Sequence, residues 1–161
     1  ETVSTGTWSA SPGWWTSDYS IRQGYTTTSG QLRGGMWFDL SGIPSGATVT
    51  GMRLTLKRIA GWGKADDVTV VAYGTASSAR SGEPVLSAGP YTLGTIGDGE
   101  TRTFALPSAL VTALAAGTCT GIVLCAADAA VIAGKTYSTN YARFGGTDGT
   151  PPRLEVTYTT T

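Results

Sequence analysis

The sequence predicts an all-β domain, built as a two-sheet antiparallel β-sandwich of the jelly-roll type with one short helix at about 107–116. Three observations predict it: apolar and polar residues alternate over many short segments, 23 glycines permit tight turns, and threonine and serine are abundant. With 161 residues and neither an internal repeat nor a long linker, we expect one domain over 1–161. The chain begins ETVSTG and ends TYTTT, so we expect a module of a longer protein.

Residues 36–57 carry the clearest strand pattern. In 36–40, apolar Met36 and Phe38 alternate with Trp37, and 52–57 alternates in the same way after a turn rich in Gly, Pro and Ser. Period-2 alternation predicts two strands, each with one face on the core. We expect the two strands to form a hairpin.

Short alternating or apolar segments predict the other strands. In chain order they are 19–24, 68–74, 91–96, 101–106, 121–127, 139–144 and 153–158. We expect loop at 25–35 and a hairpin-type turn at GDGE, 97–100. The first and last strands should share a sheet and bring both termini to one end, with Tyr158 facing inward.

Residues 107–116 predict the helix. Pro107 suits the first helical position, Leu110 and Leu114 fall on one stripe with Leu106, and Gly117 can end the helix.

Cys119 and Cys125 are the only cysteines. On one extended strand, six residues at about 3.3 Å each separate them by roughly 20 Å, whereas a disulfide needs Cα atoms within about 7 Å. We therefore expect two free thiols on a strand, which favours folding in a reducing compartment or secretion from an anaerobe.

Composition excludes several function classes. A formal net charge of zero gives the chain no general attraction to nucleic acid. The sequence also contains no run of about 18 apolar residues, so we expect no membrane insertion. The absence of histidine excludes Ser-His-Asp and Cys-His catalysis and His-ligated zinc. The acidic residues are scattered and mostly in turns, so we expect no enzyme.

Aromatic residues are the best candidates for a binding site. The flat indole of a tryptophan can stack on the apolar face of a sugar ring, and its rigidity limits the entropy lost on binding. The candidates are Trp62 in GWGK, with neighbouring Lys64, then Trp14 and Trp15 after a Pro-Gly turn, Trp37, and Tyr141 with Tyr137. For Trp62, Trp14 and Trp15 the alternative is packing against the sandwich. Trp37 either forms a platform on the sheet surface or is covered by the long middle segment.

Three aspartates are weaker candidates for a structural calcium site. Asp66, Asp67 and Asp148 could supply oxygen ligands, although an aspartate in a turn usually makes only local hydrogen bonds. We expect no other cofactor.

Three segments carry a family resemblance: FDLSGIPSGATVTGMRLTL at 38–56, DYSIRQG at 18–24 and PPRLEVTY at 151–158. Together they resemble the DNRLRE-type domains, which look like carbohydrate-binding modules. The DNRLRE string itself is absent, and 58–140 shows no matching motif. The resemblance implies a β-sandwich module of bacterial surface and secreted proteins, polysaccharide-active enzymes and phage tail proteins.

Two functions follow as expectations. The first is a non-catalytic module that binds a polysaccharide or cell-surface glycan, in a virion tail or at the bacterial surface or outside the cell. The alternative is a structural or oligomerising module of a fibre, with its aromatics buried between self-associating subunits.

Overall fold

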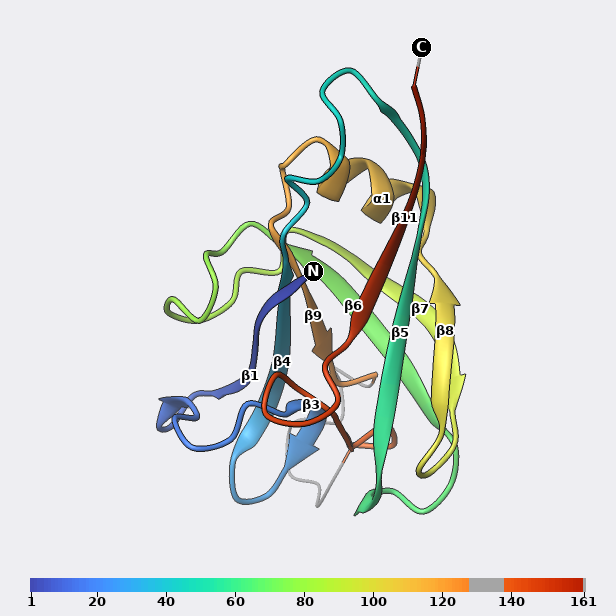
Figure 1. The fold of residues 1–161 in the computed structure, drawn as a ribbon. Helices are drawn as coiled ribbons and strands as arrows, with labels where there is room; N and C mark the ends of the chain where they lie inside the picture. Colours follow the sequence, from blue (N-terminus) through green and yellow to red (C-terminus); the bar gives the residue numbers. More distant parts are fainter. Residues whose placement is uncertain (128–137, 161) are drawn as a thin grey trace.

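The computed structural model describes residues 1–127 and 138–160 (Figure 1). In these ranges the chain is an antiparallel, sandwich-like all-β fold with one short helix, as the sequence predicts. The elements are β1 Thr2–Ser9, β2 Gly13–Trp14, β3 Ile21–Thr26, β4 Gly30–Phe38, β5 Thr48–Gly63, β6 Val68–Thr75, β7 Ala88–Ile96, β8 Thr101–Ala105, α1 Ser108–Ala115, β9 Gly121–Cys125, β10 Ala142–Phe144 and β11 Arg153–Thr159.

The strands form one curled sheet with two facing layers. The hydrogen-bonded order is β11-β5-β10-β3-β4-β9-β6-β7, with β1 and β2 added beside β4 and β8 added beside β5. One layer therefore holds β1, β4, β9, β6 and β7, and the other holds β8, β5 and β11. Strands β10 and β3 connect the two layers at one end. In Figure 1, β1 and β4 lie on the left, with β5, β8 and β11 on the right.

The hydrophobic core lies between these layers. Alternate residues of β5, including Leu54 and Leu56, pack against Ile122 and Leu124 of β9 and against α1. Burial of such side chains stabilises the fold by about 1.5–3 kcal/mol each. Strand β6 is largely buried on both faces.

Strands β4 and β5 are not a hairpin, which corrects the expectation for 36–57. Strand β4 pairs with β1, β3 and β9, whereas β5 pairs with β8, β10 and β11. The connection 39–47 crosses between the layers and is longer than the roughly two to five residues of the commonest hairpin loops. The same correction applies to 97–100: the Glu100 N–H donates to the Gly97 carbonyl at 3.1 Å, but the turn crosses from β7 to the other layer.

Other local expectations also need correction. Residues 25–35 are not a loop, since they contain the hairpin between β3 and β4, and β1 was not predicted. The first and last strands do belong to one continuous sheet, but they are not neighbours in it: β1 pairs with β4 and β11 with β5. Tyr158 is 40% exposed, although it lines the same hollow as Leu154 and Val156.

The helix and the cysteines agree with the sequence. Helix α1 begins after Pro107, and Gly117 takes the positive φ that ends it. Both thiols are free and buried, although Cys119 precedes β9 and only Cys125 lies on a strand. Burial raises the pKa of the Cys125 thiol to about 12, with a smaller lowering by Arg33.

Candidate functional site

The end of β5 presents Trp62 to solvent. Gly61 and Gly63 flank it with φ values of +75° and +83°, a left-handed conformation that glycine adopts without strain. Both carboxylate oxygens of Asp98 accept a hydrogen bond from the Gly61 N–H, at 3.1 and 3.0 Å. Trp62 is 41% exposed, and the two glycines beside it carry no side chain that could cover it.

Three of the candidate residues meet at one hollow. Trp62, Gly63, Lys64 and Tyr141 line a space of about 330 Å³, here called the Trp62 hollow. The Lys64 N–H donates to the Tyr141 carbonyl at 2.9 Å, which joins the end of β5 to the chain just before β10. A Cβ on Gly63 would lie 2.1 Å from that carbonyl oxygen, so only glycine allows this approach.

Arg58 holds the chain that leads into the Trp62 hollow. Its side chain is fully buried and donates hydrogen bonds to the carbonyls of Lys64, Asp66 at 2.9 Å and Ile96 at 3.0 Å. The Asp98 carboxylate lies 3.8 Å from its Nε. A buried charge of this kind is tolerated because its Nη groups donate to carbonyls and a carboxylate lies nearby, although its Nε has no hydrogen-bond partner among the described residues.

Two arginines lie over the ring of Trp62. The guanidinium carbons of Arg22 and Arg143 are each 4.8 Å from the ring centroid, and Arg22 also lies 4.5 Å from the centroid of Trp15. Arg22 on β3 and Arg143 on β10 are paired across the strands. Guanidinium groups are attracted to the electron-rich ring face. At least one face of Trp62 is therefore covered by cations, and these hold the ring in place.

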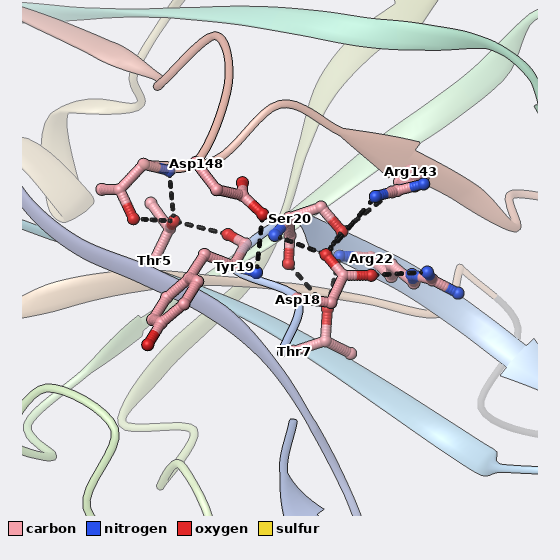
Figure 2. A network of polar contacts seen from close by, with 9 residues as sticks. Thr5, Thr7, Asp18, Tyr19, Ser20, Arg22, Arg143 and Asp148 are labelled. Atoms are coloured by element: carbon pink, nitrogen blue, oxygen red, sulfur yellow. Dashed lines mark hydrogen bonds and ion pairs between the residues drawn. The ribbon is translucent and has the colours of Figure 1, made fainter. Parts of the chain in front are cut away.

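Asp18 binds both arginines (Figure 2). It accepts from Arg22 Nη2 at 2.7 Å and from Arg143 Nη2 at 3.4 Å, and also from the Ser20 N–H and hydroxyl. Burial alone would raise the pKa of Asp18. The hydrogen bonds from Ser20 and Arg22 and the charge of Arg143 outweigh that effect, so its pKa lies below the usual value.

Sequence reasoning missed this ion network. In DYSIR, Ser20 and Arg22 are two residues apart, as are Asp18 and Ser20, and in a strand this spacing places Ser20 and Arg22 on one face. This local part of the network could have been predicted from the sequence. Nothing in the sequence shows that β10 brings Arg143 beside Arg22, because pairing between distant strands has no local signature.

Asp148 also takes part in a hydrogen-bond network, shown on the left of Figure 2. Its carboxylate accepts from the Tyr19 N–H at 3.1 Å. The Thr5 hydroxyl donates to the Tyr19 carbonyl at 2.6 Å and accepts from the Thr147 N–H at 2.8 Å. These bonds hold the loop before β11 against β1.

The structure does not gather the calcium candidates into one site. Among residues 1–127 and 138–160, no group of three or more acidic or cysteine side chains could hold a metal ion. Asp67 points toward the turn at Gly97, and Asp148 is bound to Tyr19. Asp66 contributes its carbonyl to Arg58. Calcium binding stays a prediction.

Trp37 is covered, so it does not form a surface platform. It is 4% exposed, its Nε1 donates to the Ser77 carbonyl at 2.9 Å, and its ring contacts Trp14 edge-on at 5.5 Å between centroids. Trp14 in turn donates to the Gly82 carbonyl at 2.7 Å. The alternation of the strand correctly placed Trp37 on the face opposite the core, but the segment 76–87 covers that face at Trp37.

Trp15 is half-buried and part of the supporting structure. Its Nε1 donates to the Ser9 hydroxyl at 3.0 Å, and its carbonyl accepts from Arg80. Arg80 also donates to the Thr5 carbonyl at 2.9 Å and lies 4.4 Å from the Tyr19 ring. None of Trp14, Trp15 and Trp37 lines the Trp62 hollow, although the Arg22 guanidinium contacts the rings of both Trp15 and Trp62. Tyr137 falls outside the described residues.

A larger hollow, at the end of the molecule opposite the Trp62 hollow, was not predicted from the sequence. It measures about 770 Å³ and lies between the 39–47 connection and α1, with Phe38, Leu40, Val49 and Leu114 in its lining. Its described lining carries no charged side chain.

Comparison of the sequence with protein-family models and with curated proteins finds no match. The resemblance to DNRLRE-type domains therefore stays a prediction from the three quoted segments. Within 1–127 and 138–160, no helix has the length and apolarity needed to cross a bilayer.

Proposed function

We propose that this domain is a non-catalytic carbohydrate-binding or attachment module that recognises a polysaccharide at the Trp62 hollow. The observation that carries the proposal is an exposed Trp62 beside Lys64 and Tyr141 in one hollow. A space of about 330 Å³ is at the small end of ligand sites, which suits one or two units of a longer chain.

The surroundings of Trp62 favour binding because they fix the ring before a ligand arrives. Arg22 and Arg143 lie over the ring, and the Lys64 N–H donates to the Tyr141 carbonyl. A ring that is already ordered loses little entropy when a sugar stacks on its accessible part. By analogy with the DNRLRE-type domains, we propose a place in a phage tail or in a bacterial surface or secreted protein.

Affinity electrophoresis tests this function. The protein is run through gels containing a panel of neutral and acidic polysaccharides, alongside Trp62→Ala and Tyr158→Ala. Tyr158 is a matched control, since it is 40% exposed and lies on β11. We expect retardation by at least one polysaccharide, lost in Trp62→Ala and kept in Tyr158→Ala.

The melting temperature of Trp62→Ala separates binding from packing. The two cation–aromatic contacts at this exposed ring contribute about 0.5–1 kcal/mol each, so we expect a drop of no more than a few degrees. A drop as large as that of a core substitution would show that Trp62 serves packing instead.

The second candidate function is a self-associating fibre module. The 770 Å³ hollow with Phe38, Leu40 and Leu114 in its lining favours it, because apolar surface of this kind is often covered by a partner. Light scattering tests this candidate: an oligomer that dissociates on Leu40→Glu would support it, and a monomer at all concentrations would contradict it.

A further inference from the structure

We infer that the polysaccharide bound at the Trp62 hollow is acidic, with its carboxylate or sulfate placed at the Lys64 ammonium. This inference rests on the proposed function and names the chemical class of its ligand. It starts from the contrast between Lys64 and the other cations near Trp62.

The other cations near the Trp62 hollow are already engaged. Arg22 and Arg143 share the Asp18 carboxylate, and Arg58 donates to backbone carbonyls. The Lys64 ammonium makes no hydrogen bond or ion pair with any residue in the described part of the chain. It is exposed and lines the Trp62 hollow, so it is the charge that an incoming ligand meets.

No carboxylate competes for Lys64 within the Trp62 hollow. The described lining contains no acidic residue. Asp18 and Asp98 are held by their own partners, and Asp67 points toward Gly97. An anion that enters the hollow therefore meets an ammonium group without displacing an internal ion pair.

The spacing of Trp62 and Lys64 suits a charged sugar. Two residues span at most about 7 Å of chain, so a ring stacked at Trp62 can direct a substituent toward the Lys64 side chain. A uronic acid or a sulfated sugar has both parts: an apolar face of C–H groups and an anionic group at the ring edge. A charge-assisted hydrogen bond to the ammonium is stronger than one to a neutral hydroxyl.

The fixed backbone of Lys64 limits the cost of this contact. Its N–H donates to Tyr141, and its carbonyl accepts from Arg58. The side chain alone must be ordered when the anion binds. Because the ammonium is exposed, we expect the contact to weaken as salt screens it.

The test compares polymers that differ only in charge. Polygalacturonate is matched with its methyl ester, and dextran sulfate with dextran, against the intact protein, Lys64→Gln, Trp62→Ala and Arg53→Gln. Arg53 is an exposed cation on the same strand and serves as the control. Affinity is measured by calorimetry at low and at high salt.

We expect the acidic member of one pair to bind about tenfold tighter than its neutral partner. Lys64→Gln should remove that difference and the salt dependence while retaining neutral binding, and Arg53→Gln should keep both. The uronate and sulfate arms show which anion is preferred. The same acidic affinity in Lys64→Gln and the intact protein, or equal binding of the acidic and neutral members in both pairs, overturns the inference and leaves the proposed function standing.

The proposed function fails in a different way. If Trp62→Ala binds every polymer as tightly as the intact protein, the sugar site is not at Trp62. If Lys64→Gln loses acidic binding while Trp62→Ala keeps it, the hollow is an anion site without sugar stacking. Both outcomes contradict the proposed function and can be told apart from loss of the charge preference alone.

Discussion

Arg58→Met is the substitution that tests the support of the Trp62 hollow most directly. Methionine keeps much of the aliphatic stem but removes every N–H donor of a fully buried guanidinium. The carbonyls of Lys64, Asp66 and Ile96 then lose their partner.

The size of the effect follows from where these carbonyls lie. An unpaired buried carbonyl costs about 1–3 kcal/mol. Lys64 and Asp66 are exposed, so water can replace most of what they lose, whereas Ile96 is fully buried. Counting about 2 kcal/mol for Ile96 and about 0.5 kcal/mol for each of the others gives a loss of about 3 kcal/mol in the free energy of unfolding. For a chain of this size that corresponds to a melting temperature lower by about 6–12 °C.

Urea denaturation followed by tryptophan fluorescence measures this loss. Arg53→Met is the matched control, since Arg53 is exposed on the same strand and its substitution should change stability by less than about 0.5 kcal/mol. A loss below about 1 kcal/mol for Arg58→Met would refute the reasoning, because it would mean that the three carbonyls do not depend on the guanidinium.

Three further predictions concern the rest of the chain. Trp37→Ala should lower the unfolding free energy by about 3–5 kcal/mol, measured by urea denaturation, because the ring is buried and hydrogen-bonded to Ser77. The pKa of Asp18 is lowered in the folded protein, so its ion network stabilises the fold above about pH 4, and this contribution is lost as pH falls through the folded pKa. The urea midpoints of the intact protein and of Asp18→Asn should therefore converge on acidification. A difference between the two midpoints that stays constant with pH would contradict this. The thiols of Cys119 and Cys125 should be unreactive toward a thiol reagent at pH 8 in the folded protein and count as two in denaturant, because both are buried with raised pKa values.

The strand pattern of the fold could be predicted from the sequence, but the pairing of its strands could not. Alternation in 36–40 and 52–57 correctly assigned two strands with Met36 and Leu54 in the core. It carried no information on which strands are neighbours. The connection 39–47 was long enough either to form a hairpin with a wide loop or to cross between layers, and only packing of the whole chain decides between these.

The candidate site was partly predictable for a similar reason. Two glycines around Trp62 gave a local cause for its exposure, and Lys64 and Tyr141 proved to lie beside it. Trp37 shows what alternation along a strand cannot predict: it assigns a residue to one face of the strand without showing what covers that face. Arg58 was not identified as a buried residue, since an isolated arginine in the sequence gives no sign that it will be buried.

The course of β5 has a practical consequence for how the protein can be attached to other objects. The strand starts at Thr48, which pairs with Thr159 near the C-terminus, and its 16 residues extend about 50 Å before ending at Gly63. The N-terminal strand also begins beside the 39–47 connection, where Thr2 pairs with Phe38. A tag, bead or fusion partner joined to the C-terminal end would therefore lie on the side of the molecule away from the Trp62 hollow and leave that hollow facing outward. The N-terminus lies part-way along β5, because the Thr2 hydroxyl donates to the Pro152 carbonyl and Arg153 pairs with Thr55.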